Sequence, residues 1–461
     1  MKITLVRRLF VAGALGAFLS VCQAQVIELR ATLSPMQEVP ASTSPASGNA
    51  IMLYDLASNT FDLIVSIENM ANTASASHIH EAPAGTNGSV VTNLGSEAVY
   101  TRTGSTLRAT LRGITHGGDR LKLLQSGAYF NIHSAQFPGG EIRGQLIAQP
   151  KRLVATIDVP QEQAAFPAVN LAGLNDFGGA VMQYNPATHS IRLRLSLFNF
   201  NNTFSNSHFH VGARGVSGPV SVSLGANANA GGYTSANGHI SGTFDIPMGT
   251  LDPAVLLTGG TYLNFHSTTF SGGEVRGQVR ASDEIPSTRL ANVSVRGFVG
   301  TGDQVLIQGI TVNGPDPIRV MITVKGPSLA GFGVTGALAN PRLQLFDSGQ
   351  RQIAINEDVG TVTPGSELAS IPGVPTNPLE SALVVVLPPG NYTAIASSGS
   401  GTGIALLEVM DLRNLGNTVV PASVVAGEVV VAAPVRTPAT GVKAALELCA
   451  ALPLAVSVAS R

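Results

Sequence analysis

Six of the nine histidines in this 461-residue chain recur at matched positions, and imidazole is a side chain well suited to bind a transition metal. Two His-x-His pairs are each followed by a later third histidine: His78, His80 and His133, then His208, His210 and His266. Residues i and i+2 of a strand share one face, so each pair presents both rings to the same side. Three imidazoles suit copper or zinc, and a carboxylate could supply a fourth ligand. The spacing therefore predicts a metal site in each group.

Further polar side chains alternate with apolar ones near these histidines. They are Asn131, Glu141 and Arg143 in the first group, and Asn264, Glu274 and Arg276 in the second. If their strands are neighbours in one sheet, these side chains and the histidines would share one polar surface, continued by Gln145 and Gln278. A second interpretation stays open: a hydrogen-bonded polar cluster without metal, in which the Glu–Arg pairs form ion pairs or hold the histidines.

The matched histidines belong to an internal repeat. Residues 48–88 align with 178–218 at an offset of 130, without a gap. Further on, residues 127–146 align with 260–279 at an offset of 133, and twelve of these twenty positions are identical. The chain therefore contains two copies of one domain.

The elements that position these residues are predicted to be strands. Apolar residues recur at every second position in the first copy, at Phe61, Leu63, Val65 and Ile67. This period indicates strands with one buried face. A low charged fraction of 12% and 51 glycines suit short strands joined by turns. We expect an all-β protein of sandwiches or barrels, and the formal net charge of −1 gives no indication of a nucleic-acid partner.

The repeated motifs resemble the CHRD (chordin-type) domain family. The motifs are Glu38-Val39-Pro40, the His-x-His pair with its glycine-rich loop, Tyr-x-Asn-x-His-Ser, and Gly-Gly-Glu-x-Arg-Gly-Gln. The resemblance covers residues 26–149 and 152–282 and implies immunoglobulin-like or Greek-key β-sandwich, or barrel, domains. The second copy departs where Asp158-Val159-Pro160 takes the place of Glu38-Val39-Pro40, and where Val211 replaces Glu81.

The ligand pattern also resembles that of the copper/zinc superoxide dismutases, which pair His-x-His on one strand with a distant histidine and are β-sandwiches too. That resemblance implies copper or zinc and redox chemistry. Those enzymes use further histidines and an aspartate for a second metal, whereas each copy here offers three matched histidines. We therefore expect a binding or structural protein rather than an enzyme.

The first 24 residues are typical of a Sec-type export signal. Lys2, Arg7 and Arg8 precede an apolar stretch, and cleavage after Ala24 is expected. A lipoprotein signal at Cys22 is the alternative. We expect a secreted protein, extracellular or periplasmic, with no transmembrane segment in the mature chain.

A third β-sandwich module is expected over residues 288–412, followed by a tail of low order over 413–461. The segments 296–310 and 318–338 resemble a β-sandwich module of secreted bacterial proteins. Its expected strands are Val305–Val312, Ile318–Lys325, Arg342–Phe346, Ala382–Leu387, Tyr392–Ala396 and Ile404–Met410.

Two hypotheses for the function follow. The first is an exported multi-domain binding or structural protein of the cell envelope or extracellular space, whose partner is an extracellular protein or polymer. The second is a copper- or zinc-binding protein that uses the histidine cluster of each domain, either in redox chemistry or in metal storage.

Overall fold

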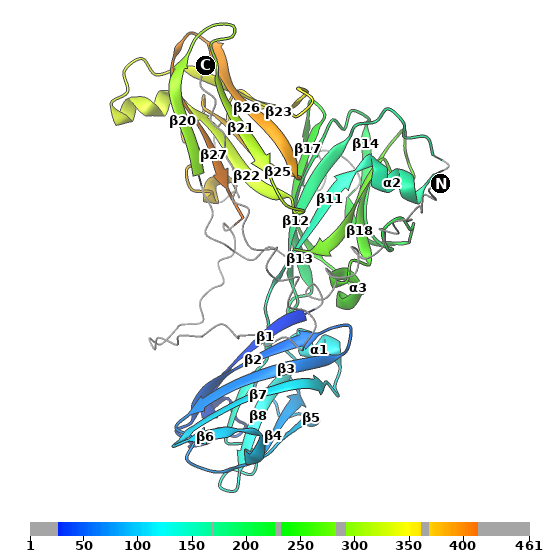
Figure 1. The fold of residues 1–461 in the computed structure, drawn as a ribbon, viewed down its shortest axis with the longest axis vertical. Helices are drawn as coiled ribbons and strands as arrows, with labels where there is room; N and C mark the ends of the chain where they lie inside the picture. Colours follow the sequence, from blue (N-terminus) through cyan, green and yellow to red (C-terminus); the bar gives the residue numbers. More distant parts are fainter. Residues whose placement is uncertain (1–25, 168, 226–231, 283–291, 361–367, 414–461) are drawn as a thin grey trace, which may run out of the picture.

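The chain folds as antiparallel β-sheets, as expected (Figure 1). The computed structural model describes residues 26–167, 169–225, 232–282, 292–360 and 368–413. The expected signal segment 1–24 and nearly all of the expected tail lie outside these residues. Within the described part of the chain, no helix combines the length and hydrophobicity that a membrane span requires.

The first domain consists of two sheets that face each other. One has the strand order β10 (Ile147–Ala148), β1 (Val26–Leu33), β2 (Ser47–Asp55), β3 (Thr60–Glu68), β7 (Thr106–Thr115) and β6 (Thr101–Thr103). The other has the order β5 (Ser89–Gly95), β4 (Ala74–Glu81), β8 (Ala128–Ser134) and β9 (Ile142–Gln145). The connections contain the short helices η1 (Pro35–Gln37), η2 (Glu97–Val99) and α1 (Arg120–Leu124).

The second domain repeats this path as a single nine-stranded sheet. Its order is β15 (Val220–Gly225), β14 (Phe204–Val211), β18 (Thr261–Ser267), β19 (Val275–Ala281), β11 (Lys151–Asp158), β12 (Phe177–Asn185), β13 (Ser190–Phe198), β17 (His239–Pro247) and β16 (Tyr233–Ala236). Helices α2 (Val159–Ala165) and α3 (Pro253–Leu257) lie in its connections.

Strand β19 explains why the two copies differ in sheet count. It runs without a break and pairs with β18 along one edge and with β11 along the other. In the first domain the same path is interrupted at Leu146, so β9 pairs with β8 and the short β10 pairs with β1. Two separate sheets in one copy and one continuous sheet in the other therefore share one strand path.

The predicted alternation of faces is confirmed. Phe61, Leu63, Val65 and Ile67 are each at most 2% exposed. Their faces meet the apolar side of the second sheet, where Ile79 is fully buried. Burial of this kind contributes about 25 cal/mol per Å² of apolar surface, so it holds the two sheets together and leaves the opposite face of each free for polar side chains.

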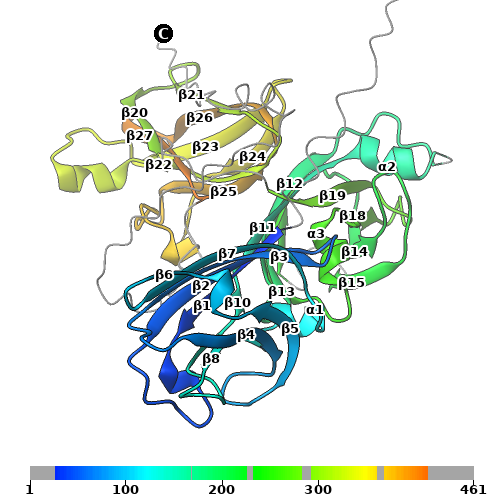
Figure 2. The same ribbon diagram turned by 60° about the horizontal axis from the view of Figure 1, so that its bottom comes forward.

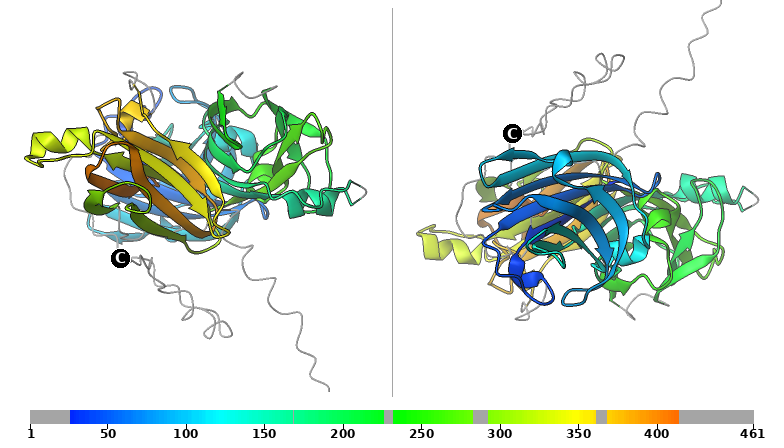
Figure 3. Two further views of the ribbon diagram at one scale, coloured as in Figure 1. Left: turned by 90° about the horizontal axis from the view of Figure 1, so that it is seen from above. Right: turned by 90° about the horizontal axis from the view of Figure 1, so that it is seen from below.

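The third unit is a sandwich of two four-stranded sheets, seen from above in the left view of Figure 3. One has the order β20 (Asn292–Val299), β27 (Gly403–Asp411), β22 (Ile318–Lys325) and β25 (Ser381–Leu387); the other has β21 (Leu306–Val312), β26 (Gly390–Ser400), β23 (Asn340–Asp347) and β24 (Gln352–Asn356). Short helices η3 (Pro327–Phe332) and η4 (Leu368–Ser370) complete it. All six expected strands are present, whereas β20 and β24 were not predicted. The burial of β20 alternates between exposed and half-buried residues, which leaves a weak apolar signal.

The second and third units are joined by buried contacts (Figure 2). Phe198, the last residue of β13, is fully buried and belongs to the apolar core of the third unit. Nearby, the Ser196 hydroxyl accepts a 3.0 Å hydrogen bond from the Val386 amide. Arg280 forms an ion pair with Asp316, whose side chain is 1% exposed. These contacts predict that the two units unfold together.

Replacing Phe198 by alanine tests this coupling. We expect Phe198→Ala to cost about 3–5 kcal/mol, as for other buried aromatic residues, and to separate one calorimetric transition into two. Phe200→Ala is the matched control, because Phe200 is buried in the core of the second domain instead. That variant should lower the transition temperature without separating the third unit. A single transition in Phe198→Ala would show that Phe198 is not what couples the two units, and separate transitions of the second and third units in the natural chain would contradict the coupling itself.

Candidate metal centre

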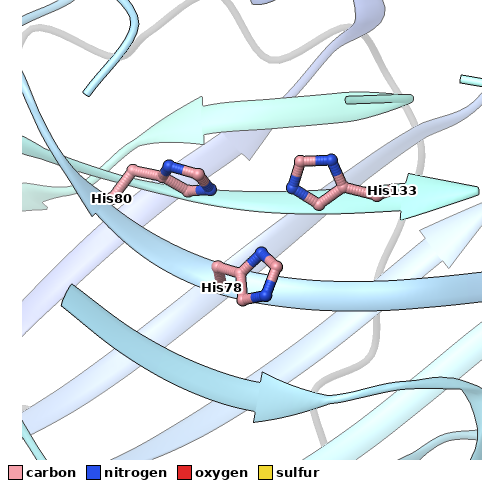
Figure 4. A group of neighbouring side chains, drawn as sticks. All are labelled: His78, His80 and His133. Atoms are coloured by element: carbon pink, nitrogen blue, oxygen red, sulfur yellow. The ribbon is translucent and has the colours of Figure 1, made fainter. Parts of the chain in front are cut away.

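The two His-x-His pairs and their distant partners meet on adjacent strands, as predicted. In the first domain, β4 carries His78 and His80, and the antiparallel neighbour β8 carries His133. His78 lies opposite Asn131, so His133 is its diagonal neighbour, two residues further along β8. Figure 4 shows the three rings turned toward a common point. In the second domain β14 and β18 repeat this arrangement with His208, His210 and His266.

The residues between the histidines point the other way. Ile79 and Ile132 are fully buried in the core, and so are Phe209 and Phe265 in the second copy. Because successive side chains of a strand alternate between faces, the imidazoles must lie on the face away from the core. The apolar packing of the strands thus fixes the direction of each histidine.

The spacing of the rings matches what one metal ion requires. In each triad, one ligand atom per histidine can be chosen so that all lie within 4.8 Å of one another. Ring centroids are 5.1 to 5.7 Å apart in the first triad and 5.1 to 6.1 Å apart in the second. Three imidazoles on a tetrahedral zinc, with Zn–N bonds of about 2.0–2.1 Å, would have centroids roughly 5.2 Å apart. Small adjustments of the rings are therefore enough for both triads.

Backbone carbonyls fix the tautomer of two histidines in each triad. His80 Nδ1 donates to the carbonyl of Gly88 at 3.0 Å, and His133 Nδ1 donates to that of Pro138 at 3.0 Å. A carbonyl can only accept, so Nδ1 holds the proton and Nε2 keeps a free lone pair. In the second triad, His210 and His266 make the same bonds to Gly218 and Ser271. Histidine ligands of metals are typically held by such a second hydrogen bond.

The ring nitrogens that do not bond to backbone carbonyls face one another. In the first triad His78 Nδ1, His80 Nε2 and His133 Nε2 are buried and have no hydrogen-bond partner among the described residues. In the second, His208 Nδ1 lies 3.2 Å from His266 Nε2. Two nitrogens bound to one tetrahedral zinc would be about 3.3 Å apart. The first triad therefore presents three lone pairs to its centre, whereas in the second only His210 Nε2 is buried without a partner in the described part of the chain, and the His208–His266 contact is close enough to be a hydrogen bond.

Burial favours the neutral form, which binds metals, in five of the six imidazoles. It lowers the pKa of His78, His80, His208 and His210, and the neighbouring imidazoles lower the pKa of His78 and His208 further. The pKa of His266 falls to about 4, mainly through burial and then through His208. At neutral pH a proton therefore competes weakly with a metal ion for these nitrogens.

In each copy, a tyrosine with an arginine stacked behind it supports the second histidine of the His-x-His pair. Tyr129 stacks on His80 with centroids 4.9 Å apart and planes 5° apart, and the Arg143 guanidinium lies 4.3 Å from the Tyr129 ring. The Tyr129 hydroxyl also accepts a hydrogen bond from the Gly88 amide at 3.2 Å. Gly88, whose carbonyl orients His80, is therefore held at both its amide and its carbonyl. Gly88 lies so close to the carbonyl of Glu81 that a Cβ there would collide with it.

The second copy has the same support. Tyr262 stacks on His210 at 4.9 Å, Arg276 lies 3.5 Å from the Tyr262 ring, and the Tyr262 hydroxyl accepts from the Gly218 amide. The tyrosines were not among the predicted site residues. The sequence does contain a signal for them, because each tyrosine lies two residues before the matched Asn131 or Asn264 and therefore on the same face of the strand.

The predicted glutamates do not join the histidines. Glu141 is fully buried beside the connections that precede β2 and β4, where it accepts hydrogen bonds from Ser44 Oγ at 2.8 Å and Asn72 Nδ2 at 3.1 Å. Arg143 instead donates to the Thr86 carbonyl and to Asn87 Oδ1. The expected Glu–Arg ion pairs are not formed within the described residues of either copy. Glu141 precedes β9, so the strand alternation that links it to Arg143 in the sequence does not extend to it.

Other predicted members lie beside the triads. Asn131 stands between His78 and Arg143 in the register, and Asn264 takes the same place in the second copy. Gln145 donates to the carbonyls of Ala82, Ser126 and Ala128, and therefore ties loops together. Gln278 makes the equivalent three bonds to Gly212, Gly259 and Thr261.

Each domain has a buried carboxyl group beside its asparagine, Asn131 or Asn264. The position of this carboxyl group in the chain corrects the sequence alignment of the two domain starts. Glu38 is 5% exposed and crowds Gly140, and Glu162 is 1% exposed and crowds Gly273. Burial raises the pKa of both carboxyls to about 7. Glu162, not Asp158, is thus the counterpart of Glu38. Asp158 caps α2 as Ser34 caps η1, because both accept from the backbone of the following turn.

Comparisons with known proteins agree with the duplicated motifs. A family model described as the CHRD domain matches residues 29–146 and 160–279. No curated protein matches the chain. Among solved structures, the pre-peptidase C-terminal domain of collagenase from Bacillus anthracis is 16% identical, with a TM-score of 0.18, and the match covers 28% of this chain and 99% of that one.

The two matched segments differ in one buried contact. Where Ser44 donates to Glu141 in the first copy, Asp176 lies beside Glu274 in the second, and both carboxyls are at most 4% exposed. Asn202 donates to Glu274 at 2.9 Å, as Asn72 does to Glu141. Burial, and then the charge of Glu274, raise the pKa of Asp176 to about 7. The pair therefore holds a proton in the folded domain.

This pair predicts a pH-dependent stability for the second domain. The unfolded Asp176 ionises near its ordinary pKa of 3.8, whereas the folded one keeps its proton up to about pH 7. The folded state therefore binds more protons between these values, and stability falls as the pH rises through them. We expect Asp176→Asn to remove this loss, a gain of about 2–4 kcal/mol at pH 8, measured by thermal unfolding across pH.

Ser44→Asp is the reciprocal control, because it places the same acid pair in the first domain. That variant should introduce a loss of stability with rising pH where the natural chain has none from this site. Unchanged pH profiles in both variants would show that the two carboxyls do not share a proton.

Proposed function

Because this chain belongs to the CHRD domain family, with two tandem copies at residues 29–146 and 160–279, we propose that each copy binds a copper or zinc ion through its three histidines. The observation that carries the proposal is the convergence of buried nitrogens without hydrogen-bond partners in the first triad, repeated with the same geometry in the second. A buried polar atom without a partner costs about 1–3 kcal/mol. A metal ion would satisfy three such nitrogens at once.

The interpretation as a metal-free polar cluster is less well supported. It expected Glu–Arg pairs that form ion pairs or hold the histidines, whereas Glu141 and Glu274 accept hydrogen bonds from other side chains. It also leaves the facing nitrogens of the first triad without donors. In a cluster built for hydrogen bonding, such nitrogens would be expected to find partners.

The ligand chemistry favours a late first-row metal. Imidazole nitrogen suits zinc and copper, while oxygen-rich sites suit calcium and magnesium. With three neutral nitrogens, copper(II) should bind more tightly than zinc in direct competition. The proposed role is binding rather than a defined turnover.

Metal analysis of untagged protein tests the proposal. After chelation and reloading with copper or zinc, the natural chain should bind about two ions, one for each triad. His133→Ala should remove one ion and His266→Ala the other, and the double variant should bind neither. His189→Ala is the control, because it removes an imidazole that lies outside both triads and bonds Tyr184. Absence of stoichiometric metal in the natural chain would refute the proposal.

We also propose that the protein acts outside the cytoplasm, as a binding or structural protein whose partner is an extracellular protein or polymer. The export-like first 24 residues support this proposal. The buried contacts at Phe198 would keep the second and third units in fixed relation, as a structural role requires.

Sequencing the N-terminus of the protein recovered from expressing cells tests export. We expect the mature chain to begin at Gln25 and to occur in the periplasm or medium. A chain that starts at Met1 and stays in the cytoplasm would contradict this proposal, without affecting the metal proposal.

A further inference from the structure

The triads supply three ligands each, and the nearby carboxylates are committed elsewhere. No carboxylate oxygen belongs to either group of ligand atoms among the described residues. Glu81, directly after His80, accepts from Lys122 Nζ at 2.6 Å and from the Asp119 amide at 2.7 Å, and its counterpart in the second copy is Val211. Glu38 and Glu162 interact with the arginines Arg143 and Arg276 and with the asparagines Asn131 and Asn264, rather than with the imidazoles. A metal in the triads would therefore have fewer protein ligands than the four of a closed structural zinc site.

The remaining position faces outward. The core lies on the opposite face of β4 and β8, where Ile79 and Ile132 are fully buried. On the metal side, His78 and His133 are partly exposed, and so is His208 in the second copy. These partly exposed rings leave a path from solvent on the side away from the core, although the three facing nitrogens of the first triad are themselves buried.

The charges around the position favour an anion. Three neutral imidazoles leave the full charge of a divalent metal uncompensated. Arg143 adds a positive charge behind the Tyr129 ring that stacks on His80, and it is 2% exposed; the acid that interacts with it electrostatically is Glu38, whose pKa burial raises to about 7. Arg276 and Tyr262 repeat this in the second domain, where Arg276 is 1% exposed. Charges held in a partly buried site act more strongly than those in water.

We propose that each bound metal keeps one exchangeable position, open to solvent, which takes a small monodentate anion. This inference rests on the metal binding proposed above. It assigns the triads to the class of open metal sites, which exchange ligands, rather than to closed sites that only stabilise a fold.

Azide titration of the copper-loaded protein tests the inference. Azide bound to copper(II) gives a charge-transfer absorption band, and we expect a saturable band with about one azide per copper. His133→Ala isolates the second site and His266→Ala the first, so each can be titrated alone. If copper is bound in stoichiometric amount and azide leaves its absorption and electron paramagnetic resonance spectra unchanged, the inference is wrong while the metal proposal stands. If no copper binds, the metal proposal itself fails, and the inference with it.

The arginine charge has its own test. In the His133→Ala background, Arg276→Met should raise the azide dissociation constant of the copper that is bound at least threefold, with the copper content of each variant measured alongside. Arg276→Lys keeps a positive charge and should restore part of the affinity. Arg112→Met is the control. Arg112 is exposed and pairs with Asp62 on the six-stranded sheet of the first domain, away from the second triad. Equal azide affinity in all these variants would remove the arginine from the inference, and the natural chain's titration decides the open position even if a variant does not fold.

Discussion

The hydrogen-bonded register between β4 and β8 is the constraint on which the site depends. It sets His78 opposite Asn131 and His80 opposite Tyr129, and so makes His133 the diagonal neighbour of His78. A shift of one residue would turn every side chain of a strand to the other face. The buried Ile79 and Ile132 oppose such a shift, because it would expose them and bury the histidines. The core thus holds the imidazoles in place without touching the metal side.

Around this register, each domain builds the same support from backbone and aromatic contacts. Gly88 is held by the Tyr129 hydroxyl at its amide and by His80 at its carbonyl, and Arg143 fixes the loop before it. The second domain repeats these contacts although its sheet is continuous where the first is broken. The support therefore depends on local strand pairing rather than on how the sheets close.

The buried carboxyls show where the copies have diverged. Glu38 and Glu162 keep the same surroundings although they lie on a 3₁₀ turn and an α-helix respectively. Elsewhere, a buried serine–glutamate bond in one copy corresponds to an acid pair in the other. Burial makes the second arrangement sensitive to pH, so two domains of one family within one chain differ in what stabilises them.

The sequence by itself determined the duplication, the strand class, the six matched histidines and the faces on which they lie, because a period of two fixes side-chain direction locally. It also predicted six of the strands of the third unit. Only the tertiary structure decided that Glu141 leaves the histidine face, that Glu162 replaces Glu38, and that Tyr129 stacks on His80. These depend on where a strand begins, on the path of a connection and on contacts between strands distant in sequence. Alternation along one strand carries no information about any of them.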